Sequence, residues 1–231
     1  NILEVARIES GKETLTETAW NLCNLEDTLD LLLDRDIYKK QLTLKKNMEL
    51  QHPKVYCDVL KIQEITMNLL SNAVKYTPEG GTIHFTIREL PYEEVSVRSQ
   101  DGLKLYGKYY EQKPGAPLEI FQTVVEDTGI GISKEYIPHL FEAFSREKSS
   151  SESGIIGTGL GLRIVKKFVD LMEGSIVVES EIGEGTRFTV TIPHRIATAN
   201  EYISEVNAKE LPEEIKLNNV RILLAEDNML N

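Results

Sequence analysis

The sequence is poor in cysteine, with only two in the chain, Cys23 and Cys57, and they lie well apart. Their spacing matches neither a metal-binding motif nor a thiol redox motif. Two free, buried thiols in a reducing compartment are therefore expected, in preference to a disulfide.

The sequence also lacks any apolar run near the roughly 20 residues that a membrane-spanning helix needs, and its first residues are not those of a signal peptide. We expect a cytoplasmic piece, although a longer parent protein could still be anchored in the cell membrane. Basic residues are in the minority, and the net charge of −11 argues against binding to nucleic acid or to anionic membranes, because both would repel the chain. A phosphate site built from backbone N–H groups and a few local cations remains compatible with this charge.

What is present is an ordinary globular composition, 41% hydrophobic and 27% charged, with no internal repeat. Segments with strand-like patterns alternate with segments of helical period. The expected strands are the start of 16–34, then 41–50, 54–57, 82–90, 118–126, 175–180 and 186–192, with a hairpin inside 91–117. The expected helices are the later part of 16–34, then 58–76, fragments around 138–144, and 159–173, the last with Gly174 in the C′ position.

The helix expected at 58–76 carries a polar stripe. With Glu64 as origin and 100° per residue, Lys75, Asn68 and Asn72 fall at about 20°, 40° and 80°. Apolar residues, among them Leu60, occupy most of the remaining surface, so the helix should be buried with its stripe facing a cavity or partners. Carboxamides can coordinate Mg²⁺ and bind phosphate without adding negative charge. The alternative is that the two asparagines only cap neighbouring loops.

Two glycine-rich segments accompany this helix. The first, 126–132 (EDTGIGI), follows a strand directly, so that Asp127 could accept a hydrogen bond from a base amine while the glycine backbone passes close to the ring; a simple tight turn is the alternative. The second, 157–162 (GTGLGL), directly precedes a helix, whose N-terminus favours phosphate. A dinucleotide-binding unit is excluded, because the glycine spacing is wrong and no βαβ unit with a ribose-binding acid follows.

Together these segments resemble the GHKL ATP-binding family and, within it, the sensor histidine kinases, over roughly residues 16–194. NLLSNAVKYTP (68–78) is similar to the N box, EDTGIGI to the first glycine box, FEAF (141–144) to the F box and GTGLGL to the second glycine box. The resemblance implies an α+β fold, a two-layer α/β sandwich with a mixed sheet packed on helices. It also implies ATP and Mg²⁺ as ligands.

The resemblance implies roles for individual residues. Asn68 would coordinate Mg²⁺, Glu64 would assist phosphotransfer (the alternatives are helix solvation or support of the metal), and Arg146 would lie near the γ-phosphate together with Lys75. Ala143 departs from the proline common in the F box. The serine-rich stretch 145–153 would be a mobile lid, with Phe141 anchoring its beginning. The expected nucleotide-binding residues are Asn68, Asn72, Lys75, Tyr76, Asp127, Gly129, Gly131, Ile132, Phe144, Gly157, Thr158, Gly159, Leu160 and Gly161.

The flanks suggest a division of the chain. Residues 1–14 resemble the end of a dimerisation and histidine-phosphotransfer hairpin, 15–195 the catalytic ATP-binding domain, 196–219 a linker, and 220–231 the first strand of a receiver domain with an acidic pair, Glu226 and Asp227. The implied partners are the protein's own hairpin domain and a receiver domain or response regulator, in a homodimeric parent of the hybrid kinase kind.

In such kinases the γ-phosphoryl group passes to a histidine on the hairpin. The four histidines here are His52, His84, His139 and His194. None lies in a helix like that of the acceptor, so each is expected to have a structural or solvent role, with the acceptor outside this sequence. Two rivals remain, a GHKL ATPase of the gyrase, mismatch-repair or chaperone kind, and a degenerate domain that binds a partner without turning over ATP.

Overall fold

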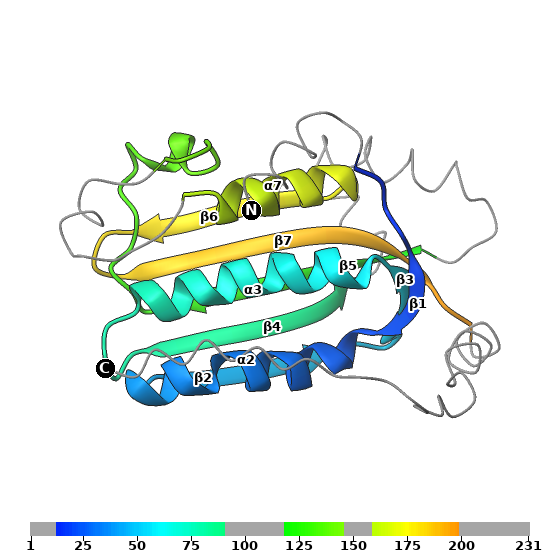
Figure 1. Ribbon diagram of the computed structural model, residues 1–231, viewed down its shortest axis with the longest axis horizontal. Helices are drawn as coiled ribbons and strands as arrows, with labels where there is room; N and C mark the ends of the chain where they lie inside the picture. The colour runs from blue at the N-terminus through cyan, green and yellow to red at the C-terminus, as the bar shows by residue number, and fades with distance from the viewer. Residues whose placement is uncertain (1–12, 91–117, 146–158, 199–231) are drawn as a thin grey trace, which may run out of the picture.

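The computed structural model describes residues 13–90, 118–145 and 159–198, with only the backbone at 30–32. These residues form a seven-stranded sheet with three α-helices on one face (Figure 1). The strands are β1 (Thr18–Asn21), β2 (Thr43–Glu49), β3 (Lys54–Cys57), β4 (Thr82–Leu90), β5 (Leu118–Asp127), β6 (Ser175–Glu181) and β7 (Gly185–Ile196). The helices are α2 (Leu25–Lys39), α3 (Val59–Tyr76) and α7 (Gly161–Leu171), with 3-10 turns η1 (Leu22–Asn24) and η2 (Ile137–His139).

The sheet has the order β1-β3-β7-β5-β4-β2, and β6 pairs with β7 beside this row. β2 runs parallel to β4, whereas the other described pairings are antiparallel, so the sheet is mixed. The two-layer α+β fold expected from the sequence is confirmed. The hairpin expected inside 91–117, the hairpin helix at 1–12 and the segments from 199 onwards lie outside the described residues.

The core lies between the sheet and the helices. On β7, Phe188, Val190 and Ile192 are buried, as the period of two predicts. They sit beside the buried side chains of β4 and β5, and α3 covers the middle of this layer with Ile65 and Leu69 (Figure 1). α2 and α7 pack on either side of α3, which places α3 at the centre of the helical layer.

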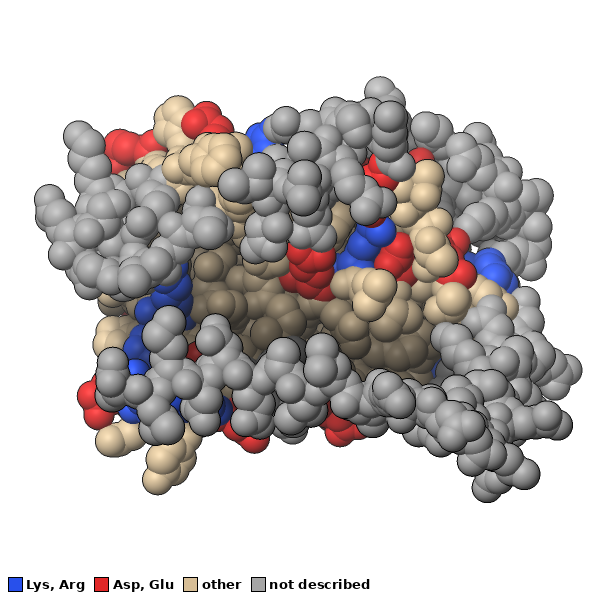
Figure 2. Space-filling model, viewed as in Figure 1, with Lys and Arg blue, Asp and Glu red and all other residues tan. Residues whose placement is uncertain are grey.

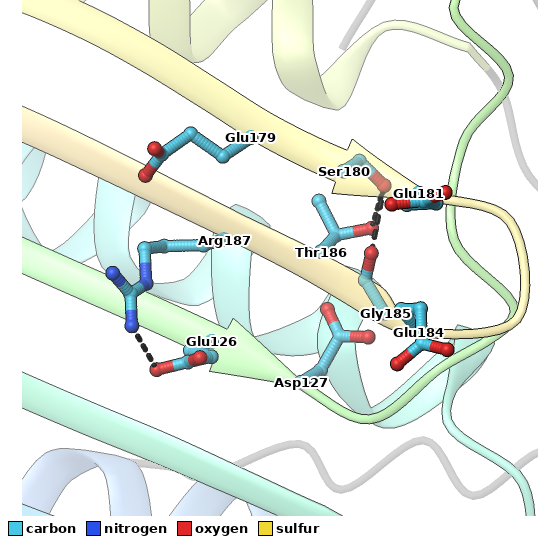
Figure 3. Close-up of a pocket in the computed structure, with 9 residues that line it drawn as sticks. All are labelled: Glu126, Asp127, Glu179, Ser180, Glu181, Glu184, Gly185, Thr186 and Arg187. Carbon is cyan, nitrogen blue, oxygen red and sulfur yellow. Dashed lines mark hydrogen bonds and ion pairs between the residues drawn. The ribbon is translucent and has the colours of Figure 1, made fainter.

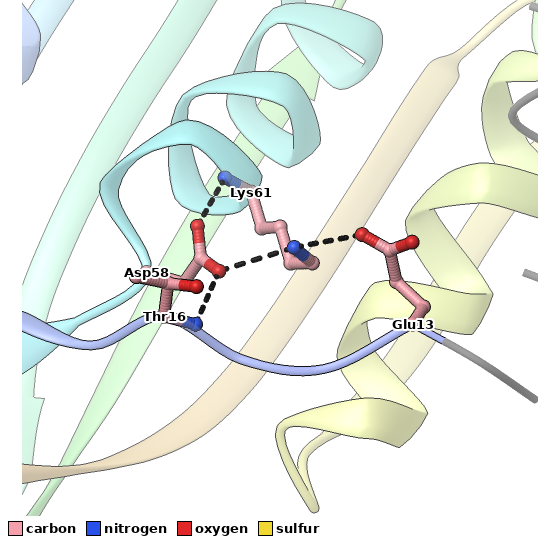
Figure 4. A network of polar contacts seen from close by, with 4 residues as sticks. All are labelled: Glu13, Thr16, Asp58 and Lys61. Carbon is pink, nitrogen blue, oxygen red and sulfur yellow. Dashed lines mark hydrogen bonds and ion pairs between the residues drawn. The ribbon is translucent and has the colours of Figure 1, made fainter.

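The N-terminus of α3 is held by a polar network (Figure 4). Asp58 caps the helix by accepting from the Lys61 N–H at 3.2 Å, and it also accepts from the Thr16 N–H at 2.9 Å. The Lys61 ammonium is 3.1 Å from both the Asp58 and the Glu13 carboxylates and 5.5 Å from the centre of the Phe168 ring. The segment before β1 is thereby tied to α3 and α7.

The C-terminus of α3 is closed by one lysine from α2's end. Lys40 Nζ donates to the carbonyls of Val74, Lys75 and Thr77 at 2.7, 3.0 and 2.7 Å. These are carbonyls that a helix end leaves without intrahelical partners, and a cation is favoured there by the helix dipole. Thr77 leaves the helix with extended backbone angles immediately before Pro78.

Three expectations are corrected. Leu60 is 76% exposed, so the apolar surface of α3 is less completely covered than its pattern suggests. α7 runs from Gly161 to Leu171, shorter at both ends than 159–173. At its start Gly159 is left-handed (φ 69°), and past its end Glu173 itself takes the left-handed conformation (φ 56°) that was assigned to Gly174. Gly174 is needed instead for close packing, since a Cβ there would lie 2.5 Å from the Thr191 carbonyl oxygen.

The two cysteines differ in their exposure to solvent. Both cysteines are free, but only Cys57 is buried, and Cys23 is half-buried. Burial, with Glu17 and Asp58 nearby, raises the pKa of the Cys57 thiol to about 12.

Within the described residues, no helix combines the length and the apolar character needed to cross a membrane.

Candidate nucleotide-binding site

The polar stripe of α3 is where the sequence places it. Glu64, Asn68, Asn72 and Lys75 are half-buried, whereas Leu69 and the other residues of α3 that face the core are buried. Figure 2 shows the helix side of the molecule, which is hollowed at its centre and mostly uncharged there. This arrangement favours a ligand-facing role over the capping of loops.

Asn68 is oriented by a bond within its own helix. Its side-chain Nδ2 donates to the Glu64 carbonyl oxygen at 2.9 Å, which turns the carboxamide oxygen the other way. That oxygen lies against the start of α7, where a Cβ on Gly161 would come within 2.5 Å of it. An oxygen ligand and the N-terminus of a helix are thus brought together, which suits a phosphate group with its metal ion.

The start of α7 is joined to the end of the F box. Phe144 N–H donates to the Gly159 carbonyl at 3.0 Å, and a Cβ on Gly159 would lie 2.9 Å from the Phe144 backbone. Gly159 has φ 69° and Phe144 φ 61°, so both take the left-handed conformation that favours glycine. Phe144 and Gly159 are therefore in direct contact, two residues before the glycine that approaches Asn68, and Leu160 between these glycines is buried.

Asp127 marks the other end of the site. It ends β5, is paired in register with Thr186 of β7, and is buried. Its carboxylate accepts from the Gly129 N–H at 2.8 Å and from the Thr186 backbone N–H. Burial nevertheless raises the pKa of this carboxyl to about 6, because desolvation outweighs the two hydrogen bonds, with Glu126 adding a smaller effect in the same direction.

Gly129 lets this turn approach the end of α3. A Cβ on Gly129 would lie 2.4 Å from Asp127 Oδ1 and 2.8 Å from the Tyr76 carbonyl oxygen, which itself accepts from the Ile130 N–H at 3.2 Å. The Lys75 ammonium is 5.0 Å from the centre of the Tyr76 ring. The last turn of α3 and the glycine-rich segment 126–132 thus form one connected wall.

The same turn is attached to the β6–β7 hairpin. Gly131 has φ 71°, and a Cβ there would lie 2.0 Å from the Glu181 carbonyl oxygen. The Ile132 N–H donates to Ser180 Oγ at 2.8 Å, and Ser180 Oγ lies 2.9 Å from Thr186 Oγ1. Ser180 and Thr186 were not among the expected site residues. The one hint in the sequence was that Thr186 is polar, although it shares a face of β7 with the apolar residues Phe188, Val190 and Ile192.

A hollow of about 330 Å³ opens at this hairpin end of the sheet (Figure 3). It is lined by Glu126, Asp127, Glu179, Ser180, Glu181, Glu184, Gly185, Thr186 and Arg187. Because side chains alternate along a strand, Asp127, Thr186 and Ser180 share the helix side, while Glu126, Arg187 and Glu179 lie on the other face. The residues that line the hollow therefore come from both faces of the sheet. Only those on the helix side, Asp127, Thr186 and Ser180, belong to the candidate site.

The polar pair on the other face is a surface feature. Arg187 Nη2 donates to Glu126 at 2.9 Å, and these two side chains are 47% and 44% exposed.

In the described part of the chain, no group of three or more histidine, cysteine, aspartate or glutamate side chains gathers to hold a metal ion. Of the expected site residues, Arg146, Gly157 and Thr158 lie outside the described residues.

All four histidines lie within the described residues. His52 is paired with Glu89 at 2.6 Å, His139 with Glu142 at 2.8 Å, and His84 is exposed on β4. His194 is buried beside the Phe121 ring, and burial lowers its pKa to about 4. None of them lies on the stripe of α3.

The fold and these contacts define a GHKL-type ATP-binding domain. Residues 57–196 match the family model for histidine kinase-, DNA gyrase B- and HSP90-like ATPases. The chain belongs to this family. The match begins at Cys57, the last residue of β3, and runs through α3 to the end of β7.

Curated relatives include sensor kinases from distant organisms. The chain is 31% identical over its whole length to the autoinducer 2 sensor kinase/phosphatase LuxQ of Vibrio harveyi, and 32% identical over 87% of its length to histidine kinase 5 of Arabidopsis thaliana. It spans 24% and 22% of those two proteins, about a quarter of their length.

Solved structures agree on the fold. A full-length ShkA structure in complex with AMPPNP has a TM-score of 0.64 at 24% identity, with 86% of this chain and 35% of that chain covered. The catalytic domain of the histidine kinase ThkA has a TM-score of 0.56 at 23% identity, with 77% of this chain and 97% of that domain covered. At these identities the likeness establishes the architecture alone.

Proposed function

We propose that this chain binds ATP with Mg²⁺ along the stripe of α3 and delivers the γ-phosphoryl group to a histidine other than its own four. The observation that carries the proposal is that α3 meets two chemically different walls, one near each end of its stripe. Asn68 faces the N-terminus of α7, and Tyr76 adjoins the buried carboxylate of Asp127. Eight residues of helix separate these two ends, about 12 Å at 1.5 Å per residue, which is the length scale of a nucleoside triphosphate.

The phosphates would lie at the Asn68 end. The backbone N–H groups in the first turn of α7 offer donors and a positive dipole end, and Gly161 lets the backbone come close. Arg146 would add positive charge, and Asn72 would bind phosphate through its carboxamide. Lys75, whose ammonium lies 5.0 Å from the centre of the Tyr76 ring, would reach toward the phosphates from the base end of the helix. The Asn68 oxygen fits Mg²⁺, which prefers oxygen ligands and would neutralise phosphate charge when bound.

The base would lie at the Asp127 end. An ionised carboxylate there accepts a hydrogen bond from the adenine exocyclic amine, and Gly129 and Gly131 allow the backbone to pass close to the ring. Tyr76 would pack against the base. Ile132, with the expected lid residues Phe144, Gly157, Thr158, Gly159 and Leu160, would complete the pocket.

Glu64 is the candidate positioning group for the nucleophile. It lies one turn before Asn68 on the same stripe, where a carboxylate could orient an incoming imidazole and take up its proton. The acceptor histidine would come from a dimerisation and phosphotransfer hairpin, with a receiver domain or response regulator as the next partner and a homodimeric, hybrid-type parent. The site would face the cytoplasm, where ATP is available.

Phosphoryl transfer tests this function. The chain is incubated with γ-³²P-ATP and Mg²⁺, with and without a separately supplied phosphotransfer hairpin from a related sensor kinase. We expect label on the hairpin and none on the chain alone, and the Asn68→Ala variant should give no label. Steady ATP hydrolysis without any acceptor would favour the ATPase alternative, and binding without transfer or hydrolysis would favour the degenerate binding module.

A further inference from the structure

Ser180 stands at the junction of three parts of the base end. It is half-buried in β6 and lies on the side of the strand opposite to its exposed neighbours Glu179 and Glu181. Its Oγ is 2.8 Å from the Gly185 carbonyl oxygen and 2.9 Å from Thr186 Oγ1 (Figure 3). It also accepts from the Ile132 N–H at 2.8 Å.

These three contacts fix where each hydrogen points. A serine hydroxyl has one hydrogen to donate and two lone pairs to accept with. The backbone N–H of Ile132 can only donate, and the carbonyl of Gly185 can only accept, so the hydrogen of Ser180 goes to Gly185. The remaining lone pair must accept the hydrogen of Thr186, because no other assignment satisfies all three contacts.

Thr186 is thereby left with lone pairs alone. Its single hydroxyl hydrogen is used on Ser180, so toward a ligand its Oγ1 can only accept. Its register partner Asp127 also only accepts when ionised, and that carboxylate is already held by the Gly129 and Thr186 N–H groups. Two adjacent acceptors therefore line the helix side of the hollow.

We propose that Ser180 determines base specificity, by holding the Thr186 hydroxyl as an acceptor. A purine with an amino group at C6 offers two N–H donors to this pair. A purine with a carbonyl at C6 would place its own lone pairs against Thr186 and Asp127, which leaves polar groups unpaired in a buried site. Ser180 acts here as a positioning residue that does not touch the base, and this inference rests on the proposed function.

The experiment is a comparison of affinities by calorimetry. Non-hydrolysable ATP and the matching inosine triphosphate analogue, which carries the C6 carbonyl, are titrated into the chain and its variants with Mg²⁺. In Ser180→Ala, Thr186 is free to turn and donate to the carbonyl, so the preference for ATP should fall about tenfold, the equivalent of one hydrogen bond. Ser180→Thr, which keeps the hydroxyl, should restore the preference, and Ser175→Ala on the same strand should leave it unchanged.

The Thr186→Val background separates positioning from general damage. Thr186→Val alone should lower both ATP affinity and the preference, and adding Ser180→Ala should then change the preference less than about twofold, because the hydroxyl it controls is gone. An unchanged preference in Ser180→Ala or in Thr186→Val would overturn the inference while leaving ATP binding intact. Failure of the unaltered chain to bind the ATP analogue would overturn the proposed function as well.

Discussion

The side-chain oxygen of Asn68 and the first residue of α7 are in such close contact that a Cβ on Gly161 would come within 2.5 Å of that oxygen. The carboxamide cannot turn away without losing the bond from its Nδ2 to the Glu64 carbonyl. The Asn68 carboxamide and the N-terminus of α7 therefore have a fixed spacing that only glycine allows.

Gly161→Ala should weaken the binding of the Mg²⁺ complex of an ATP analogue at least tenfold, because the new methyl group displaces Asn68 or the start of α7. The melting temperature should change little, since alanine is the better helix former and offsets part of the strain. Calorimetry gives the affinity and thermal unfolding gives the stability.

A matched glycine provides the control. Gly183, in the β6–β7 turn, has φ 84° but open space around its Cα, so Gly183→Ala should lower stability by about 1 kcal/mol and leave affinity unaltered. The contact between Asn68 and Gly161 would be unimportant if Gly161→Ala bound nucleotide like the unaltered chain.

Asp127 should give nucleotide affinity and stability opposite pH dependences. Its pKa is raised from 3.8 to about 6 in the folded chain, so between these values the folded state holds a proton that the unfolded state has lost. The contribution of Asp127 to the free energy of unfolding therefore falls as pH rises from about 4 to 6. Affinity for ATP needs the ionised acceptor and should rise over a similar window.

The measurement is a series of calorimetric titrations between pH 5 and pH 7.5. Because the pKa of the Asp127 carboxyl is about 6, only about a tenth of it is ionised at pH 5. The affinity at pH 5 should therefore be about tenfold lower than the affinity of the fully ionised site. Asp127→Asn should bind weakly and show only the pH dependence of the nucleotide itself. The assignment of Asp127 to the base would fail if the variant and the unaltered chain shared one pH profile.

The network at the start of α3 should be a large contributor to stability. Asp58→Ala removes the helix cap and leaves Lys61, whose side chain is only 12% exposed, paired with Glu13 alone. We expect the free energy of unfolding to fall by about 3 kcal/mol in denaturant titrations. The Lys166–Asp170 pair on α7, with both side chains more than 40% exposed, is the control, and Asp170→Ala should change stability by less than about 0.5 kcal/mol. Equal effects of Asp58→Ala and Asp170→Ala would contradict a special role for the network.

Much of the site was predictable because it lies on regular elements. The period of 3.6 placed Glu64, Asn68, Asn72 and Lys75 on one side of α3, and the structure confirms that they share a half-buried face. The strand before Asp127 was recognisable as a run of apolar residues, and this carboxylate does end β5. Local periodicity is enough to predict such positions, since neighbours along the chain decide them.

Contacts between distant segments were not predictable in this way. Lys40 caps α3 across more than thirty positions of sequence, and its pattern in the chain is that of any surface lysine. Ser180 joins the turn at Ile132 to Thr186 only because the β6–β7 hairpin folds back beside β5. The exposure of Leu60 was missed for the same reason, as tertiary packing and not the helical pattern decides which apolar residues are covered.

Nucleotide calorimetry on the intact chain bears most directly on the proposal that the stripe of α3 holds ATP between Asn68 and Asp127. The titrant is a non-hydrolysable ATP analogue, with and without Mg²⁺, into the unaltered chain, Asn68→Ala and Asp127→Asn. We predict binding that needs Mg²⁺ in the unaltered chain and is at least tenfold weaker in each variant, with the dependence on Mg²⁺ lost in Asn68→Ala. Undiminished affinity in both variants would contradict the assignment of this surface as the nucleotide site.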